Sequence, residues 1–251
     1  MDEFVGKVVI VTGGSQGVGL GIARAFLDEG ASVVTCARTA FDVPPAAASD
    51  DQLARCAHVA ADVRVDGDID RVIATAVERF GRVDVLVNNA GGQPPADIAT
   101  ASPRFVRAII ELNLSAPMVF AQKAYAVMSK QDSGGSIINI SSQASMPGGG
   151  GGTLTPYGAA KAGLNHMTRS LAVAWGRKVR VNCVSLGWVE TEAMVDLLLT
   201  GDEARSQEWL QRIPVGRMGT AGEIGGICVF LASERASYIN GTTIWADGGG
   251  T

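Results

Sequence analysis

The feature that most constrains the fold is a regular alternation between short apolar runs and amphipathic helical segments. Parallel strands need crossover connections of this kind, and such crossovers are right-handed in nearly all sheets. The alternation therefore predicts an α/β fold, with a doubly wound sheet of seven mainly parallel strands and helices on both faces. The predicted strands cover residues 7–11, 31–37, 58–63, 83–87, 135–140, 179–184 and 242–246.

The length and charge of the chain limit its organisation and its partners. Its 251 residues suit one large α/β domain, so we expect a single domain over residues 1–251. No apolar run approaches the ~20 residues needed to span a bilayer, which predicts a cytoplasmic protein without a membrane partner. A net charge of −4 without a Lys/Arg-rich run argues against a nucleic-acid partner.

The cysteines show no CxxC spacing, and two of them lie in apolar runs that read as strands. We therefore expect free, buried thiols and neither a disulfide nor a metal site. The four residues are Cys36, Cys56, Cys183 and Cys228.

A glycine-rich turn follows the first strand and opens a helical pattern that runs to Gly30. Glycines at positions 13, 17 and 19 allow the backbone to turn tightly and to approach a pyrophosphate at the helix N-terminus. The spacing is GxxxGxG, which differs from the GxGxxG of the common dinucleotide fingerprint. The turn indicates a nucleotide-phosphate site, and a plain glycine turn is the alternative.

The ends of the second and third strands bear on the choice of nucleotide. An acidic residue after the second strand would accept hydrogen bonds from a ribose 2′-OH, but here Ala37 is followed by Arg38. A guanidinium can pair bidentately with a 2′-phosphate, so we expect NADP(H) to be preferred, with NAD(H) possible. A solvated arginine at a strand end is the alternative. Asp62, followed by Val63, could reach an adenine amino group.

The residues with the clearest chemistry are Tyr157 and Lys161, which lie four positions apart on a predicted helix over 157–175 and thus share one face. A free tyrosine titrates near pH ~10, and a nearby positive charge lowers its pKa toward the working range. Tyr157 could then exchange a proton with a substrate oxygen. When only the spacing is considered, the commoner explanation is that Tyr157 and Lys161 share a helix face without any catalytic role.

Four further stretches are predicted to surround this pair. Residues 88–91 place two amides and a glycine after a buried strand, where open parallel sheets bind ligands. Asn113 lies inside an apolar helix predicted over residues 102–130 and needs partners if it is buried. The five glycines at 148–152 predict a mobile loop, and residues 192–212 predict one or two helices that form a lid.

Together these motifs resemble the short-chain dehydrogenase/reductase family, in particular its single-domain members of about 250 residues. Residues 12–19 match the family's TGxxxGxG cofactor turn, residues 88–91 match its NNAG, and Tyr157 with Lys161 matches its YxxxK. The resemblance covers nearly the whole chain. It implies a Rossmann-like fold that binds a nicotinamide dinucleotide.

The resemblance implies hydride transfer between nicotinamide and a carbonyl or alcohol carbon, with Tyr157 as general acid or base. Lys161 would lower the Tyr157 pKa and bind the nicotinamide ribose, and Asn113 would hold a water of a proton relay. Ser142 would stabilise charge on the substrate oxygen. Ser142 lies two residues farther from Tyr157 than is usual in the family, so Ser141 is the alternative.

The family pattern also implies the cofactor contacts. The predicted cofactor-binding residues are Gly13, Ser15, Gln16, Gly17, Val18, Gly19, Arg38, Asp62, Val63, Asn89, Ala90, Gly91, Tyr157, Lys161, Gly187, Val189 and Thr191. Two departures bear on them: Leu186-Gly187 replaces the common Pro-Gly, and Gln16 stands where many NADP-dependent members carry Arg or Lys.

The expected partners are a small-molecule carbonyl or alcohol and further copies of the chain. Apolar residues of the predicted lid hint at a hydrophobic substrate, although they could equally be subunit or core contacts; they are Met194, Leu197, Leu198, Leu199 and Trp209. Residues 240–249 resemble the family's usual ending, which often packs in a homotetramer, so we expect a homotetramer or a dimer. A catalytically silent dinucleotide-binding or regulatory protein, and a relative with epimerase or dehydratase chemistry, are the alternative functions.

Overall fold

The strands form one continuous parallel sheet. The structure is a computed structural model that describes residues 3–41, 44, 46–192 and 210–250. The strand order is β3-β2-β1-β4-β5-β6-β7, and every neighbouring pair is parallel. This confirms the predicted doubly wound, Rossmann-like sheet. The strands are β1 (Val8–Thr12), β2 (Ser32–Ala37), β3 (Cys56–Ala60), β4 (Val85–Asn88), β5 (Gly135–Ser142), β6 (Val179–Leu186) and β7 (Thr243–Ala246).

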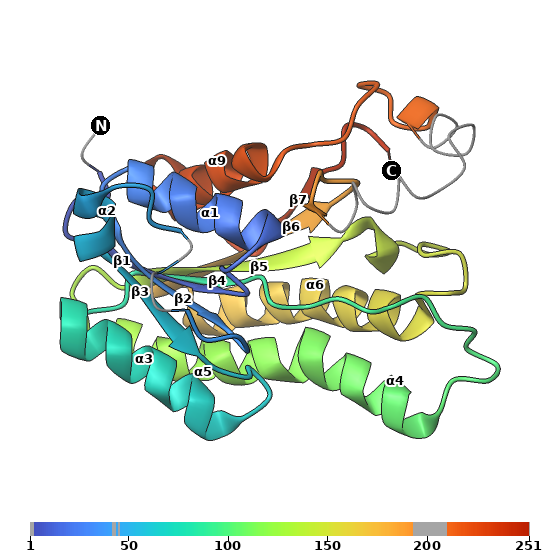
Figure 1. Cartoon of the computed structure of the whole chain (residues 1–251), viewed down its shortest axis with the longest axis horizontal. Helices are drawn as coiled ribbons and strands as arrows, with labels where there is room; N and C mark the ends of the chain where they lie inside the picture. Colours follow the sequence, from blue (N-terminus) through green and yellow to red (C-terminus); the bar gives the residue numbers. More distant parts are fainter. Residues whose placement is uncertain (1–2, 42–43, 45, 193–209, 251) are drawn as a thin grey trace.

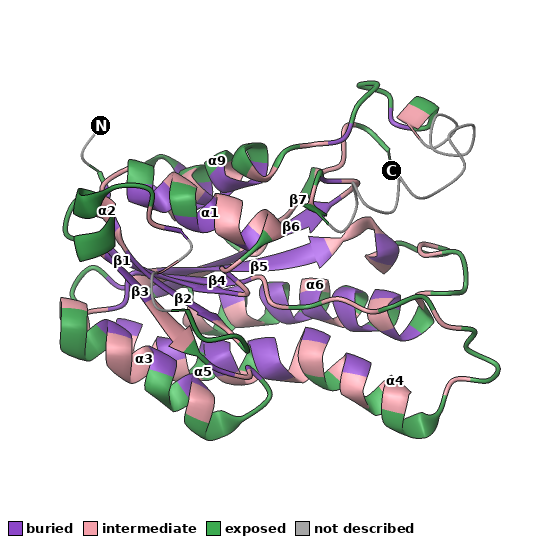
Figure 2. Cartoon of the chain, in the orientation of Figure 1, coloured by how far each residue is buried: buried purple, intermediate pink, exposed green. Residues whose placement is uncertain are grey.

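Helices cover both faces of the sheet (Figure 1). Helices α1 and α9 pack on one face, and α3, α5 and α6 pack on the other, so the core has two apolar layers. The strands are buried between these layers (Figure 2). The helices are α1 (Gly17–Asp28), α2 (Asp50–Ala54), α3 (Asp66–Phe80), α4 (Pro103–Ile110), α5 (Ala116–Met128), α6 (Thr155–Trp175) and α9 (Ala221–Ala232).

Most strand boundaries differ from the sequence prediction by one or two residues. Strand β3 begins and ends earlier than predicted, and it ends early because the backbone N–H of Asp62 donates to the carboxylate of Asp68, which turns the chain into α3. Helix α2 is a short element that was not predicted from the sequence. Its N-terminus is capped by Ser49, whose hydroxyl accepts from the N–H of Gln52, and this local bond favours a helix in an otherwise polar segment.

The helix predicted over residues 102–130 is interrupted rather than uniform. A single π turn, η1 (Glu111–Ser115), separates α4 from α5. The glycine-rich segment after β5 begins with a short 3-10 helix, η2 (Gln143–Ser145), and another, η3 (Glu234–Ala236), follows α9. The predicted lid falls almost wholly at residues 193–209, outside the described residues, and so do all five of its apolar candidates.

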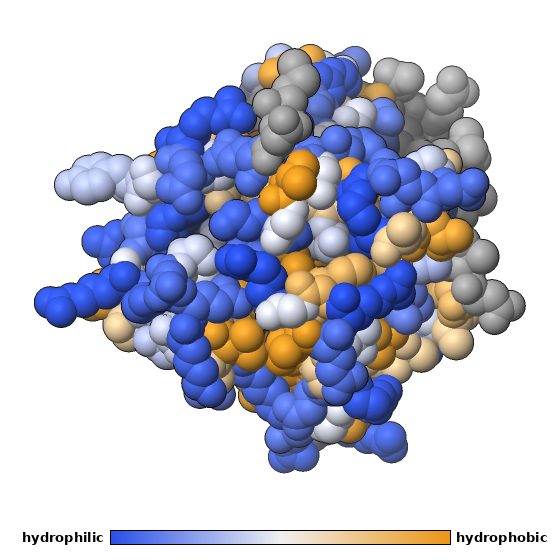
Figure 3. Space-filling view, turned by 90° about the vertical axis from the view of Figure 1, so that its left-hand side faces the viewer, coloured by the Kyte–Doolittle hydropathy of each residue, from blue (hydrophilic) through white to orange (hydrophobic). Residues whose placement is uncertain are grey.

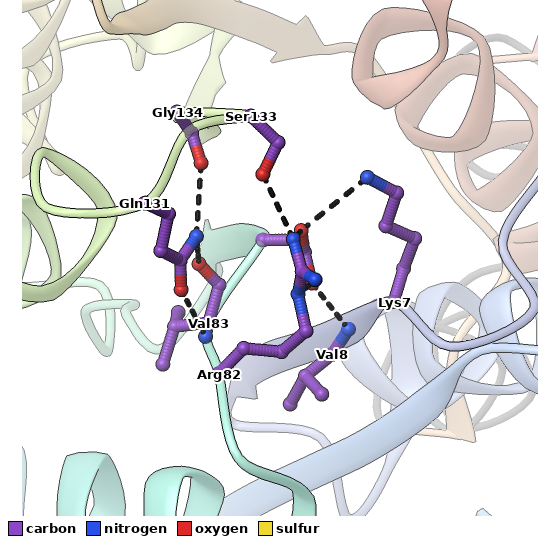
Figure 4. Close-up of polar contacts among 8 residues, drawn as sticks. Lys7, Val8, Arg82, Val83, Gln131, Ser133 and Gly134 are labelled. Atoms are coloured by element: carbon purple, nitrogen blue, oxygen red, sulfur yellow. Dashed lines mark hydrogen bonds and ion pairs between the residues drawn. The ribbon is translucent and has the colours of Figure 1, made fainter.

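A buried carboxylate organises the amino-terminal edge of the sheet (Figure 4). Asp84, just before β4, accepts from the backbone N–H of Val8 at 2.9 Å and from two nitrogens of Arg82 at 2.7 Å each. Lys7 lies 3.5 Å from the same carboxylate, and Arg82 also donates to Ser133. These bonds tie β1, β4 and the turn before β5 together on a face whose surface is mainly polar with apolar patches (Figure 3).

The cysteines and the helices bear on the expected free thiols and on the expected absence of a membrane span. All four cysteines are buried and free, as predicted. Across the described ranges, no helix has both the length and the apolar character needed to cross a membrane.

Candidate active site

A pocket of about 520 Å³ opens at the carboxyl ends of the central strands. It brings together segments that are far apart in the sequence: the turn after β1, the ends of β2 and β3, and the turn after β4. This is the position at which open parallel sheets bind ligands. The predicted residues that line it are Gly13, Ser15, Gln16, Gly17, Val18, Gly19, Arg38, Asp62, Val63, Asn89, Ala90, Gly91 and Thr191.

The glycine turn brings the backbone close to this pocket. Gly13 and Gly17 have φ values of 66° and 53°, which favour glycine. A Cβ atom at Gly19 would lie 2.2 Å from the carbonyl oxygen of Gly13, so no larger residue fits there. Helix α1 begins at Gly17, and Gln16 gives it no side-chain cap. The N–H groups of its first turn therefore have no side-chain acceptor, and such a helix N-terminus favours an anion.

Thr12 joins the glycine turn to the turn after β4. Its hydroxyl accepts hydrogen bonds from the backbone N–H groups of Asn89 and Ala90, both at 2.9 Å. In return, the side-chain amide of Asn89 donates to the carbonyl oxygen of Thr12 at 2.9 Å. The two motifs are thus one rigid unit. Thr12 was not among the predicted site residues, although it is the first residue of the TGxxxGxG motif.

The end of the pocket next to β2 and β3 contains a second arginine that sequence reasoning missed. Arg64 also lines the pocket and holds the carboxylate of Asp62 through two side-chain bonds of 2.9 and 2.6 Å. The hydrogen bond from Arg64 lowers the pKa of Asp62. Asp62 therefore enters the pocket as half of an ion pair. The only sequence signal for this ion pair was that Asp62 lies two residues before Arg64.

Tyr157 and Ser142 meet beside Lys161 at the start of α6. Tyr157 shares a hydrogen bond with Ser142, which lowers its pKa, but burial of the phenol has the larger effect and the net shift of its pKa is upward. The amino group of Lys161 lies 5.5 Å from the centre of the Tyr157 ring and donates to the carbonyl oxygen of Ile140 at 2.8 Å. The direction is opposite to that expected from Lys161, because burial outweighs the other contributions.

The neighbouring serine points elsewhere. Ser141 is buried, and its hydroxyl donates to the backbone carbonyl of Lys161 at 3.3 Å. Successive residues of a strand point to opposite faces, and β5 extends to Ser142, so only one of the two can face Tyr157. The geometry favours Ser142.

Asn113 connects the turn after β4 to the helix that contains it. Its amide donates to the carbonyls of Ile109 and Gly92, and its Oδ1 accepts from the N–H of Gly92 at 2.8 Å. The expectation that this buried amide needs partners is confirmed. A Cβ atom at Gly91 would lie 2.6 Å from Asn113 Oδ1 and 3.2 Å from Lys161 Nζ. The amide and the ammonium group therefore converge on the same glycine, and Asn113 lies within the π turn.

The remaining predicted residues lie after β6. Gly187 packs so closely on Asp247 that a Cβ atom would lie 2.7 Å from its Cα, and Val189 pairs with Gly219. Neither lines the pocket as far as the described residues define it. Thr191 does, and it lies against Gly17 of the glycine turn.

Comparison with known proteins identifies the family. Residues 13–251 match the family described as enoyl-(acyl carrier protein) reductase. The chain is 38% identical over 251 residues to L-fucose dehydrogenase from Rattus norvegicus, which covers 98% of this chain and 90% of the relative. It is 36% identical over 254 residues to 3-oxoacyl-(acyl-carrier-protein) reductase from Chlamydia pneumoniae, which covers 98% of this chain and 97% of the relative.

A solved structure also matches the fold over nearly the whole chain. The crystal structure of a short-chain dehydrogenase from Bacillus anthracis aligns with a TM-score of 0.85 and 35% identity, and the match covers 98% of this chain and 96% of that one. Sequence and structure thus agree over nearly the full length. The chain belongs to the short-chain dehydrogenase/reductase family of oxidoreductases.

Proposed function

We propose that the protein transfers a hydride between the nicotinamide of NAD(P)(H) and the carbon of a carbonyl or secondary alcohol. The observation that carries the proposal is the hydrogen bond between Tyr157 and Ser142, beside a buried Lys161 and a glycine-lined pocket. A protein that only bound a nucleotide would need no general acid, so the silent alternative is not favoured. The uncapped α1 and the close glycines fit the pyrophosphate of such a cofactor.

Each polar residue then has a distinct task. The bound nicotinamide cofactor supplies or accepts the hydride. Tyr157 gives a proton to the substrate oxygen in reduction and removes it in oxidation, and Ser142 donates a hydrogen bond to that oxygen. Lys161 favours the phenolate and binds the nicotinamide ribose, while Asn113 holds the water that links Lys161 to solvent.

The raised pKa of Tyr157 must be overcome for this chemistry. Each unit by which the pKa falls corresponds to about 1.4 kcal/mol of differential stabilisation. A fall of a few units therefore requires the positive charge of Lys161 together with that of the oxidised nicotinamide ring. On this basis, binding of the oxidised cofactor activates the tyrosine.

We further propose that NADP(H) is preferred. Arg38 lines the pocket and makes no hydrogen bond or ion pair within the described residues, so its guanidinium is available to a 2′-phosphate. The negative charge of Asp62 is already matched by Arg64. Gln16 gives no additional positive charge, which leaves Arg38 as the main determinant of the preference.

The substrate and the assembly are proposed at a coarser level. Relatives named for L-fucose and for a 3-oxoacyl-(acyl-carrier-protein) both share more than a third of the sequence, so we propose a small-molecule carbonyl or alcohol. A hydrophobic substrate and a cytoplasmic location stay predictions of the sequence. We also propose a homotetramer or dimer, because α6, α9 and β7 expose large apolar side chains; they are Val173, Phe230 and Trp245.

The proposal is tested by Tyr157→Phe in a carbonyl library screened with NADPH and NADH. Turnover should fall by roughly 10²- to 10⁴-fold, because the general acid is lost while the ring is kept. Tyr125→Phe is the control, since Tyr125 only stacks on Trp175 and a phenylalanine can do the same. If Tyr157→Phe folds, binds cofactor and retains most of its turnover, the proposed function is wrong.

The cofactor preference is tested by titration calorimetry of NADPH and NADH on the wild type and on Arg38→Ala. NADPH should bind more tightly to the wild type, and the difference should close in the variant while NADH affinity changes little. Equal or tighter binding of NADH by the wild type would contradict the preference and leave the hydride-transfer proposal standing.

A further inference from the structure

The helix that carries Tyr157 begins without a cap of its own. Its N-cap residue, Leu154, has no side-chain oxygen, and Pro156 in the first turn has no N–H. The N–H of Tyr157 is therefore an unsatisfied donor of the first turn unless another segment supplies an acceptor.

That acceptor is the side chain of Gln93, from 64 positions earlier in the sequence. Its Oε1 accepts from the backbone N–H of Tyr157 at 3.0 Å. The same amide donates through Nε2 to the carbonyl oxygen of Thr153 at 2.9 Å, and the N–H of Ala96 donates to that oxygen as well. One side chain thus caps the catalytic helix and holds the residue that ends the glycine-rich loop.

The loop itself has few other restraints where it leads into α6. Thr153 and Thr155 bond back to the carbonyls of Gly150 and Gly152, which closes the loop on itself. Gly148 and Gly150 to Gly152 have positive φ values, so no side chain among them can fix the path. At this end the loop is attached to the rest of the site through the carbonyl of Thr153, which accepts from the side chain of Gln93 and from the N–H of Ala96.

Gln93 is also continuous with the cofactor side of the site. It lies two residues after Gly91, the glycine on which Asn113 and Lys161 converge. A shift of this turn would therefore move the acceptor that holds the N–H of Tyr157. The side chain links three parts of the site: the turn after β4, the loop and the helix.

We propose that Gln93 is a positioning residue for Tyr157 and for the glycine-rich loop. The acceptor half of its amide fixes the first turn of α6 and with it the direction of the phenol. The donor half fixes the loop that borders the substrate. The inference rests on the proposed role of Tyr157 as the proton donor. The acceptor and donor functions of the Gln93 amide can be tested separately.

The test uses two substitutions at Gln93 and one control. Gln93→Met keeps the length but removes both bonds, and we expect kcat to fall roughly 10- to 100-fold because the phenol loses its alignment. Gln93→Glu keeps the acceptor and loses the donor, so kcat should recover to within about threefold. In both variants KM should be raised, because the loop loses its hydrogen bond from Gln93. A carboxylate near the phenol also disfavours the phenolate, so the pH profile of kcat should shift to higher pH.

Gln52→Met is the matched control. Gln52 makes the same pair of bonds at the remote helix α2, accepting from Ala48 and donating to Asp28, so its loss should leave kcat, KM and the pH profile unchanged. Wild-type kcat and KM in Gln93→Met would overturn the inference. So would a loss in Gln93→Met that Gln93→Glu fails to restore. If Tyr157→Phe retains turnover, the proposed function fails instead, which separates the two results.

Discussion

At the scale of single residues, Lys161 is the most costly group in the site. Its side chain is 3% exposed, and its printed hydrogen bond goes to a neutral carbonyl, that of Ile140. Burial therefore lowers its pKa from 10.5 to about 8. A charged Lys161 at this position therefore lowers the stability of the folded protein.

This cost has a defined pH dependence. Because the pKa is lower in the folded protein, the unfolded chain binds the proton more tightly, and the cost is fully present below pH about 8. It fades as the pH rises toward 10.5. The free energy of unfolding of the wild type, minus that of Lys161→Met, should therefore rise by about 2 to 3 kcal/mol between pH 7 and pH 10. Urea unfolding of both proteins at the two pH values measures the difference.

The subtraction matters because other groups titrate in the same range. Burial raises the pKa of Cys56 to about 11 and that of Cys36 to about 12, and neither thiol depends on Lys161, so both proteins lose the same stability from them as the pH rises. A difference that stays constant from pH 7 to pH 10 would contradict the assignment of the low pKa to Lys161. The methionine variant should also lose turnover, since it keeps the volume but removes the charge.

Residue-scale prediction from the sequence succeeded where the signal was local. The spacing of Tyr157 and Lys161, and of the glycines after β1, is fixed within one turn of chain, and the structure places these residues beside one pocket or one another. Gln93 could not be found in this way, because its contacts with Thr153 and Tyr157 form only after the chain has folded back. Arg64 lies two residues from Asp62, but that spacing alone does not distinguish a pocket residue from an arginine at the surface.

At the scale of elements, the close packing of α1 on α9 places the glycine turn. A Cβ atom at Gly225 would lie 2.7 Å from that of Ala25 and 3.0 Å from the carbonyl oxygen of Gly21. The two helices can therefore approach this closely only with glycine at the contact. Since the N-terminus of α1 lines the pocket, the contact also fixes the position of its N–H groups.

We predict opposite effects for two neighbouring glycines of α9. Gly225→Ala should lower the free energy of unfolding by about 1 to 3 kcal/mol and weaken cofactor binding, because α1 must shift. Gly226→Ala should raise it by about 0.5 to 1 kcal/mol, since an added Cβ meets no atom within 4 Å and alanine favours a helix. Urea unfolding and cofactor titration of both variants provide the measurement. Equal effects of the two substitutions would show that the contact does not set the position of α1.

Element boundaries were less predictable than element types. The helix over residues 102–130 has a continuous apolar stripe, and one π turn adds a single residue that this pattern does not reveal. The early end of β3 depends on the Asp68 carboxylate reaching the N–H of Asp62. Such side-chain bonds to the backbone compete with the sheet, and their outcome is decided by three-dimensional contacts.

At the scale of the whole molecule, the sheet separates two kinds of polar cluster. The pocket, Tyr157 and Lys161 lie at the carboxyl ends of the strands, whereas Asp84 and its partners lie at the amino ends (Figure 4). The alternation of strands and helices predicted that ligand-binding residues would gather at the carboxyl ends. It did not predict the ionic cluster, because Lys7 is brought to Arg82 and Asp84 only by the pairing of β1 with β4.

This separation predicts that stability and catalysis can be changed independently. Asp84→Ala leaves Arg82 and the N–H of Val8 without their acceptor at a site where the carboxylate is 6% exposed. We expect the free energy of unfolding to fall by about 3 kcal/mol, since the guanidinium of Arg82 and the N–H of Val8 lose the carboxylate that accepts their hydrogen bonds. The turnover per folded molecule should stay within about twofold of the wild type, because the cluster lies at the opposite edge of the sheet from Tyr157.

Urea unfolding measures the free energy of unfolding, and an unchanged m-value shows that the change lies in stability alone. The turnover is measured as kcat normalised to the folded fraction. Asp132→Ala is the control, because Asp132 is an exposed carboxylate in the turn before β5 and its loss should change stability by less than about 0.5 kcal/mol. A normalised kcat that falls with unchanged stability would mean that the amino-terminal edge communicates with the site through the strands. The expected result, lower stability with normal turnover, would mean that the fold carries its catalytic and structural charges on separate edges.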